Sequence, residues 1–186
     1  AEDSVPVSPP RPRTRQWWDD LFDEEYLRTV RAPSSEQTKR ECDFIEKCLG
    51  LKLGSTVLDV GCGRGTQVVE MTRRGYLGVG MDLSLAMLSR AADEAQRKEQ
   101  EINFLHADMR EIKFEGTFDA VICMGTTFGY FEEDANRAVI NRLHRALKPG
   151  GALLIEVVNR DHVIASQPNL VWFEGDACVC MEETTF

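Results

Sequence analysis

The stretch Val57–Thr66, VLDVGCGRGT, decides the fold of this 186-residue chain. An apolar run leads straight into three glycines at alternate positions, and a helix-like segment follows. Glycine permits a sharp turn and lets a ligand approach the main chain closely. The first turn of a helix then offers free N–H groups to an anionic group. The stretch therefore predicts a strand, a glycine-rich ligand-binding loop and a helix, and the alternative is a tight strand–helix turn without a ligand.

Short apolar runs alternate with helix-like segments on both sides of this loop. The predicted strands are Thr56–Val60, Leu77–Met81, Ile102–His106, Phe118–Met124 and Ala152–Val158. The predicted helices between them are Thr66–Arg74, Leu83–Lys98 and Asp134–Leu147. This alternation, with right-handed crossovers, is typical of an α/β fold with a doubly wound, mostly parallel sheet. Residues 51–158 are thus expected to form one α/β core.

The residues before this core differ from it in composition. Residues 1–15 are rich in proline and polar side chains, which predicts a disordered tail. Residues 16–50 predict a helical lid over the core. Two helices are expected in the lid, one over Gln16–Val30 and one that Ser34 or Ser35 caps and that runs to about Leu49.

The last segment, residues 159–186, predicts a substrate-side or added β segment. The expected elements are a short helix over Asn159–Ser166 and strands over Leu170–Phe173 and Ala177–Thr185. The chain stops inside a strand-like run, so we interpret this segment as truncated.

Composition and charge narrow the functional classes. Lys and Arg number 22 against 31 Asp and Glu, a net charge of −9, which disfavours nucleic-acid binding. No apolar run approaches the roughly 20 residues that span a bilayer, so no membrane partner is expected. The six cysteines form no Cys-x-x-Cys pair and favour a reduced, cytoplasmic setting. Three scattered histidines predict no metal site.

Asp82 stands at the end of the second predicted strand, 21 positions after Gly61. A carboxylate at that place can accept both hydrogen bonds from a ribose diol. The alternative is that Asp82 or Ser84 simply caps the following helix. Together with the glycine loop, Asp82 predicts a nucleotide-like cofactor.

Two further motifs distinguish between cofactors. Asp108 and Met109 follow the third strand, where the acid can accept from an adenine amino group and the methionine can cover the ring. Leu147–Gly151, LKPGG, makes a sharp turn into the fifth strand. Thr66 stands where a nicotinamide-binding loop has Gly or Ala. These features favour an adenosyl-methionine enzyme over a dinucleotide enzyme.

With these motifs in order, residues 36–161 resemble the class I S-adenosyl-methionine-dependent methyltransferases, which have a Rossmann-like fold. Leu21–Leu27 (LFDEEYL), Thr127–Phe131 (TFGYF) and Val158–Asp161 (VNRD) resemble a bacterial group of small-molecule methyltransferases. The resemblance implies methyl transfer from S-adenosyl-methionine, with S-adenosyl-homocysteine as product, to an O, N or C atom of a small-molecule acceptor. The alternatives are a non-catalytic adenosyl-methionine-binding module and a nicotinamide oxidoreductase.

The resemblance also implies a cofactor site. The glycine loop would approach the methionine part of the cofactor, and Asp59 would fix the loop or reach the ammonium group through water. Asp82 would bind the ribose hydroxyls. Asp108 and Met109 would bind the adenine. The residues implied are Asp59, Gly61, Cys62, Gly63, Asp82, Leu83, Asp108, Met109, Cys123 and Met124.

The acceptor side is less defined, and no catalytic residue is assigned. His162 and Tyr130 are catalytic candidates, although a solvated loop residue and a core aromatic are the alternatives. Tyr26, Asn159 and Arg160 are substrate-side candidates, and Arg160 could equally form a surface ion pair. A general base is needed only if the reacting atom of the acceptor carries a proton.

The family sheet has seven strands, ending in an antiparallel pair, whereas five core strands are assignable here. We therefore expect the chain to lack the C-terminal strands of the family. An unpaired sheet edge and exposed apolar surface would follow, and homodimerisation is one expected consequence.

Overall fold

The computed structural model describes residues 16–30, 32–166 and 170–184. The predicted tail, residues 1–15, lies outside the described residues. A five-stranded sheet forms the centre, in the order β3-β2-β1-β4-β5, and every neighbouring pair in it is parallel. Its strands are β1 (Thr56–Val60), β2 (Leu77–Asp82), β3 (Asn103–His106), β4 (Phe118–Cys123) and β5 (Leu147–Ile155).

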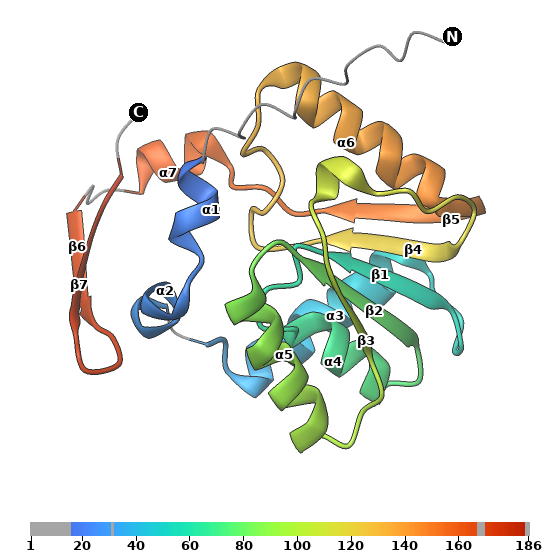
Figure 1. The fold of residues 1–186 in the computed structure, drawn as a ribbon, viewed down its shortest axis with the longest axis horizontal. Helices are drawn as coiled ribbons and strands as arrows, with labels where there is room; N and C mark the ends of the chain where they lie inside the picture. Colours follow the sequence, from blue (N-terminus) through green and yellow to red (C-terminus); the bar gives the residue numbers. More distant parts are fainter. Residues whose placement is uncertain (1–15, 31, 167–169, 185–186) are drawn as a thin grey trace, which may run out of the picture.

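Helices cover both faces of this sheet (Figure 1). One face carries α3 (Ser35–Leu49), α4 (Thr66–Arg73) and α5 (Leu85–Arg97), and the other carries α6 (Glu133–Ala146). A one-turn 3-10 helix, η1 (Met109–Glu111), follows β3. The predicted doubly wound α/β fold is confirmed.

The central strand β1 separates two apolar layers because successive side chains point to opposite faces. Leu58 packs in a buried cluster with Val139 and Leu143 of α6. Its neighbour Val57 packs in a second cluster with Ile45 of α3 and residues of α4 and β4. Burial on both faces explains why β1 is a nearly continuous apolar run.

The helical segment before the core differs in part from the prediction. The helix over Gln16–Val30 is wrong as a single element, because the structure has α1 (Trp17–Leu21) and α2 (Glu24–Thr29). The carboxylate of Asp23 accepts a hydrogen bond from Tyr26 N at 2.9 Å and starts a new helix. The second predicted helix is confirmed as α3, with Ser34 as its N-cap.

The last strand of the sheet also begins earlier than predicted. β5 starts at Leu147 instead of Ala152 and ends at Ile155 instead of Val158. Phe118 pairs with Leu147 and Ala120 with Ala152, so the residues between these pairs, Lys148–Gly151, form a bulge. Within the described residues, β5 is an edge strand that pairs with β4 alone.

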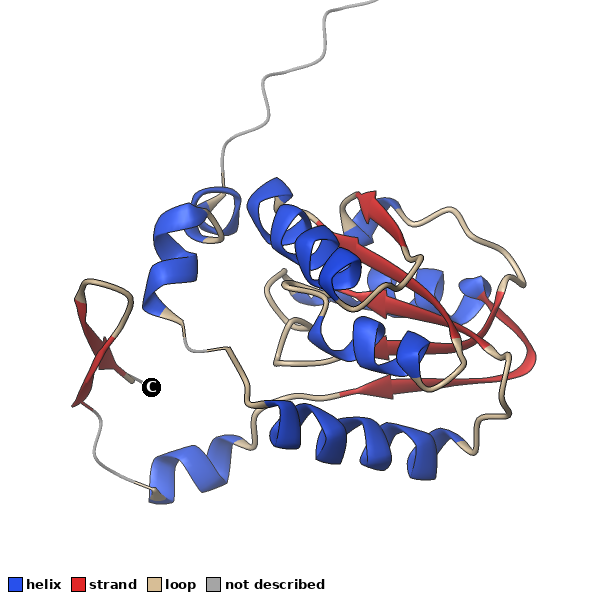
Figure 2. Cartoon of the chain, turned by 90° about the horizontal axis from the view of Figure 1, so that it is seen from below, coloured by secondary structure: helices blue, strands red, loops and turns tan. Residues whose placement is uncertain are grey.

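The C-terminal segment lies apart from the sheet, on the side of α1 and α2 (Figures 1 and 2). It consists of α7 (Arg160–Ala165) and an antiparallel hairpin of β6 (Leu170–Glu174) and β7 (Val179–Glu183). The hairpin contacts the end of α2, where Asp176 N donates to the carbonyl of Arg28 at 2.8 Å. No helix in the described part of the chain is long and apolar enough to cross a membrane.

Candidate functional site

A cavity of about 200 Å³ opens where the strands end. The arrowheads of the parallel strands point toward α1 and α2, which stand across from the sheet edge (Figure 1). The cavity is lined by Trp18, Phe22, Tyr26, Gly61, Gly63, Met81, Asp82, Leu83, Met87, Ala107, Asp108, Met109, Gly125, Thr127, Tyr130 and Phe131. The carboxyl edge of a parallel sheet, beside the point where the strand order reverses, is where open α/β folds bind ligands.

The glycine loop forms one wall of the cavity. Its start is anchored to β2, because the N–H groups of Gly61 and Cys62 both donate to the carbonyl of Met81, at 2.7 and 2.9 Å. A Cβ at Gly61 would lie 2.1 Å from a side-chain carbon of Thr127, so only glycine fits there. A Cβ at Gly63 would meet no atom within 4 Å. The loop is therefore tightly packed at Gly61 and open at Gly63.

Asp82 holds the loop and faces the cavity at the same time. One carboxylate oxygen accepts from Gly63 N at 2.8 Å and the other from Ser84 N at 2.8 Å. A carboxylate oxygen has more than one acceptor position, so both oxygens can take a further hydrogen bond. Burial raises the pKa of this carboxyl, and the backbone N–H donors oppose that shift. Ser84 itself is the N-cap of α5, so the capping role goes to Ser84.

Asp59, two residues before Gly61 in β1, is a charged side chain inside the core. Its residue is 1% exposed, and its Oδ2 has no hydrogen-bond partner among the described residues. Burial, and then the negative charge of Asp82, raise the pKa of Asp59 from the ordinary 3.8 to about 7. Asp59 does not line the cavity but places a titratable group close behind the loop.

Asp108 is bound by a residue that the sequence motif did not include. The guanidinium of Arg110 donates to both of its carboxylate oxygens, the shortest contact being 2.6 Å. The same guanidinium lies over the ring of Phe131, 4.6 Å from the centroid, and 5.7 Å from that of Trp18. A planar cation is thus held between an acid and two aromatic rings.

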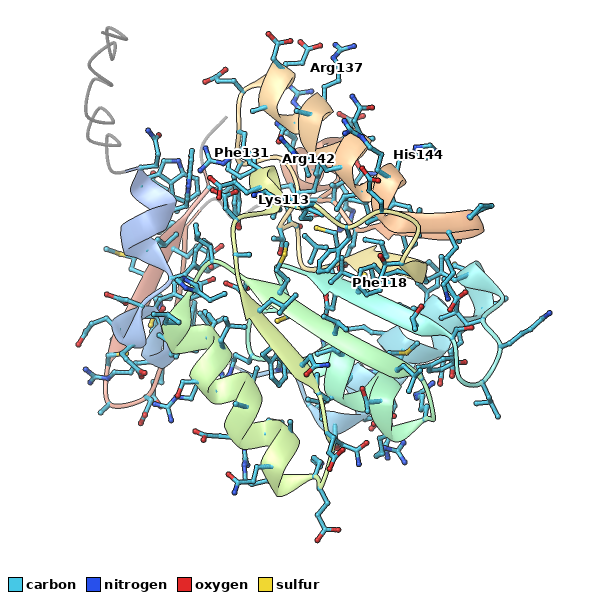
Figure 3. All side chains as sticks on the ribbon, turned by 45° about the vertical axis from the view of Figure 1, so that its right-hand side comes forward. Lys113, Phe118, Phe131, Arg137, Arg142 and His144 are labelled. Atoms are coloured by element: carbon cyan, nitrogen blue, oxygen red, sulfur yellow. The ribbon has the colours of Figure 1, made fainter. Side chains whose placement is uncertain are left out.

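Five aromatic side chains form the wall opposite the glycine loop. This aromatic wall consists of Trp18, Phe22, Tyr26, Tyr130 and Phe131. Phe22 meets Tyr26 edge to face at 4.9 Å and stacks on Tyr130 at 5.9 Å between centroids. Trp18 meets Phe131 at 5.2 Å, and Phe131 lies between the start of α6 and α1 (Figure 3). Trp18 comes from α1, Tyr26 from α2 and Phe22 from the turn between them, so this segment forms one side of the cavity.

The structure brings only part of the predicted site together. The predicted residues that line the cavity are Tyr26, Gly61, Gly63, Asp82, Leu83, Asp108, Met109 and Tyr130. Cys62, Cys123 and Met124 are buried near it and do not line it. Asn159 caps α7, and the exposed Arg160 and His162 lie in that helix, away from the lining residues.

Several lining residues were not singled out from the sequence. Met87 and Gly125 carry no motif of their own, and Thr127 and Phe131 were quoted only as part of the TFGYF resemblance. Arg110, which contacts the wall without lining the cavity, was not part of the motif around Asp108. The sequence feature that could have identified these residues is their position, because each of them follows the end of a parallel strand by a few residues.

The sheet order, the glycine loop after β1 and the acid at the end of β2 define a Rossmann-like nucleotide-binding site. Residues 57–151 match the family model described as a methyltransferase domain, and the chain belongs to that family. The resemblance to the class I S-adenosyl-methionine-dependent methyltransferases is confirmed.

Relatives and solved structures agree with this assignment. The chain is 30% identical over 131 residues to a glycine/sarcosine N-methyltransferase of Aphanothece halophytica, covering 69% of this chain and 49% of that protein. It is 30% identical over 148 residues to a ubiquinone biosynthesis O-methyltransferase of Alkalilimnicola ehrlichii, covering 78% and 56%. An S-adenosylmethionine-dependent methyltransferase from Clostridium acetobutylicum shares the fold, with a TM-score of 0.69 and 22% identity over 80% of this chain and 62% of that one. The chain spans about half the length of the curated relatives it matches.

Proposed function

We propose that this chain binds S-adenosyl-methionine in the cavity and transfers its methyl group to a small-molecule acceptor. The observation that carries the proposal is the Asp82 carboxylate, held by Gly63 N and Ser84 N at the cavity wall with acceptor positions to spare. Relatives named for N- and O-methylation support the reaction class and leave the acceptor atom open.

The residues present fit this cofactor. Asp82 would accept from the ribose hydroxyls, and the open space at Gly63 would admit the methionine part against the backbone. Leu83 and Met109 would enclose the adenine, with Asp108 at its amino edge. The unpartnered oxygen of Asp59 supplies negative charge near a cationic ligand. Cys62 and the backbone at Cys123 and Met124 would complete the methionine end, as the family resemblance implies.

The protein contributes orientation and a dry pocket more than acid–base chemistry. When bound, the cofactor supplies a methyl group that is already activated by positive charge. The aromatic wall would exclude water and fix the acceptor beside the loop. Burial raises the pKa of Tyr130 above its ordinary value of 10, so its phenol stays neutral near pH 7 and can orient the acceptor by hydrogen bonding. We propose α1 and α2 as the lid, and His162 as a surface residue of α7.

Calorimetric titration of the 186-residue chain with S-adenosyl-methionine and S-adenosyl-homocysteine tests the proposal. NADH is the control ligand. Asp82→Asn should weaken binding of both sulfur ligands by at least about tenfold, because each hydrogen bond to a charged group contributes roughly 1.5–3 kcal/mol. Asp93→Asn, an exposed acid on α5, is the matched control and should bind like the parent.

The outcomes separate the alternatives. Binding of the sulfur ligands that depends on Asp82 and not on Asp93 supports the site. Binding of NADH alone would overturn it in favour of an oxidoreductase. Binding without methyl transfer in any acceptor screen would favour a cofactor-binding module.

A further inference from the structure

We propose that the acceptor is a small amine without a carboxylate or phosphate group, which the aromatic wall binds as a cation. The bound ammonium would release a proton to solvent, and its nitrogen lone pair would then take the methyl group and leave S-adenosyl-homocysteine. The inference rests on the proposed function, because it assumes that the cofactor occupies the glycine-loop side of the cavity. It names the class of acceptor that the opposite side can recognise. Its basis is the charge of the lining and the arrangement of the rings.

The described cavity lining contains acidic side chains and no cationic one. Asp82 and Asp108 line it, and no lysine, arginine or histidine stands among the described lining residues. The guanidinium of Arg110, which lies over two rings of the wall, is paired with Asp108, so the charges of these two residues offset each other. An anionic acceptor would therefore be buried without a cationic side chain of the lining as its partner.

Groups just behind the wall add to the negative charge. Glu182 of β7 lies close enough to Tyr26 that its charge helps burial to raise the pKa of that phenol. At Tyr130, burial raises the pKa most, and the charge of Asp82 acts in the same direction after the effects of Tyr26 and Cys123. The acids Glu182 and Asp82 are therefore close enough to act on the rings, and negative charge near the rings would favour a cation.

The rings supply the specific contact. Phe22, Tyr26 and Tyr130 are half-buried, line the cavity and pack on one another through edge-to-face and stacked contacts. Aromatic faces attract cations most strongly where water is excluded. The other two rings of the wall, Trp18 and Phe131, already hold the Arg110 guanidinium in this way. The remaining three rings line the cavity, so part of the surface of each is open to a ligand.

Three probes of similar shape and different charge test the inference. The chain is first saturated with S-adenosyl-homocysteine. Phenethylamine, 2-phenylethanol and 3-phenylpropanoate are then titrated, and binding is followed by tryptophan fluorescence, to which Trp17, Trp18 and Trp172 contribute. We expect the amine to bind most tightly, the alcohol more weakly and the acid not detectably. Binding of the acid as tight as that of the amine, or no binding of the amine, would overturn the inference.

Variants of the wall connect the effect to the rings. Phe22→Leu keeps the apolar contact and removes the π face. It should therefore weaken binding of the amine by about tenfold and change binding of the alcohol by less than about twofold. Tyr26→Leu is a second variant in case Phe22→Leu loosens α1. Phe44 is an exposed phenylalanine on α3, away from the cavity. Phe44→Leu is therefore the matched control, and it should leave the affinities for the amine and the alcohol unchanged. If both wall variants weaken binding of the amine and of the alcohol by the same factor, the rings do not recognise the cation and the inference is contradicted.

The binding of S-adenosyl-homocysteine separates this inference from the proposed function. If the homocysteine product binds and the amine does not, the acceptor class is wrong and the cofactor site stands. If the product itself fails to bind to the parent chain, the proposed function fails first. The wall variants should leave product binding within about twofold of the parent, because the predicted cofactor contacts come from the glycine loop and the ends of β2 and β3.

Discussion

Replacement of Asp59 by Asn should make the unliganded protein more stable at alkaline pH. The side chain is fully buried in β1, and one of its oxygens has no partner among the described residues. Above its pKa of about 7, the folded chain holds a buried carboxylate that water would solvate in the unfolded chain. Asn has nearly the same shape and no charge, so it removes this penalty at every pH.

The magnitude follows from the pKa. The pKa rises from 3.8 to about 7 on folding, and each pKa unit corresponds to about 1.4 kcal/mol between the two protonation states. Ionised Asp59 therefore destabilises the fold by up to about 4 kcal/mol. Because the folded pKa is raised, this destabilisation is absent below pH 4, grows as the pH rises and is complete above about pH 7.

Urea denaturation at half-unit steps between pH 5 and pH 8 measures the effect. The carboxyls of Glu70 and Asp119 have pKa values lowered to about 2 by their cationic partners, so they stay ionised over this range. The free energy of unfolding of the parent should fall relative to that of Asp59→Asn as the pH rises, by about 2–4 kcal/mol in total. Parallel curves for the two proteins would refute the reasoning, even if their absolute stabilities differ, because a buried amide has its own unpaired donors. Asp93→Asn, on the surface of α5, should give a curve parallel to that of the parent.

Three further substitutions, one of them a control, test the packing of the core helices and loops by urea denaturation. Gly65→Ala places a Cβ 2.8 Å from the Cβ of Ala91 at a φ of +73°, and should cost about 2–4 kcal/mol. Gly116→Ala, also at positive φ but with open space around it, should cost about 1 kcal/mol, and an equal loss at both positions would contradict the steric argument. Arg74→Met removes the guanidinium that Glu70 shares with two acids of α3, and should cost about 1–2 kcal/mol, because Asp43 and Glu46 lose this cation while Glu70 keeps Arg73. An unchanged stability would show that these ion pairs are fully solvent-screened.

Most of the fold was readable from local sequence because its determinants are local. β1 lies in the middle of a parallel sheet, so Thr56–Val60 is apolar on both faces and its limits were predicted to the residue. The start of α3 followed from Ser34, whose hydroxyl caps the helix, and its end from Gly50 in the left-handed conformation. Asp23, a residue type that often caps helices, could have predicted the break between α1 and α2. The helical spacing of the apolar residues in this segment favoured one continuous helix instead.

The site was only partly readable because it is built from residues far apart in the chain. Gly63 and Asp82 were predicted from their spacing, and their contact at 2.8 Å follows from the pairing of β1 with β2. The aromatic wall could not be derived in this way, because α1 and α2 reach the cavity through tertiary packing alone. The partnership of Arg110 with Asp108 likewise depends on the turn of η1 and on the rings above it.

The buried acid and the aromatic wall share one physical explanation. Asp59 has an oxygen without a hydrogen-bond partner among the described residues, and the wall places three half-buried rings at the cavity. Under the proposed function both features would become favourable with a cationic ligand, because positive charge would stabilise the Asp59 carboxylate and interact with ring faces. Local rules of stability fail most often where a protein holds a ligand. A buried acid close behind the glycine loop breaks such a rule, and the proposed cationic cofactor would explain why this position carries an acid.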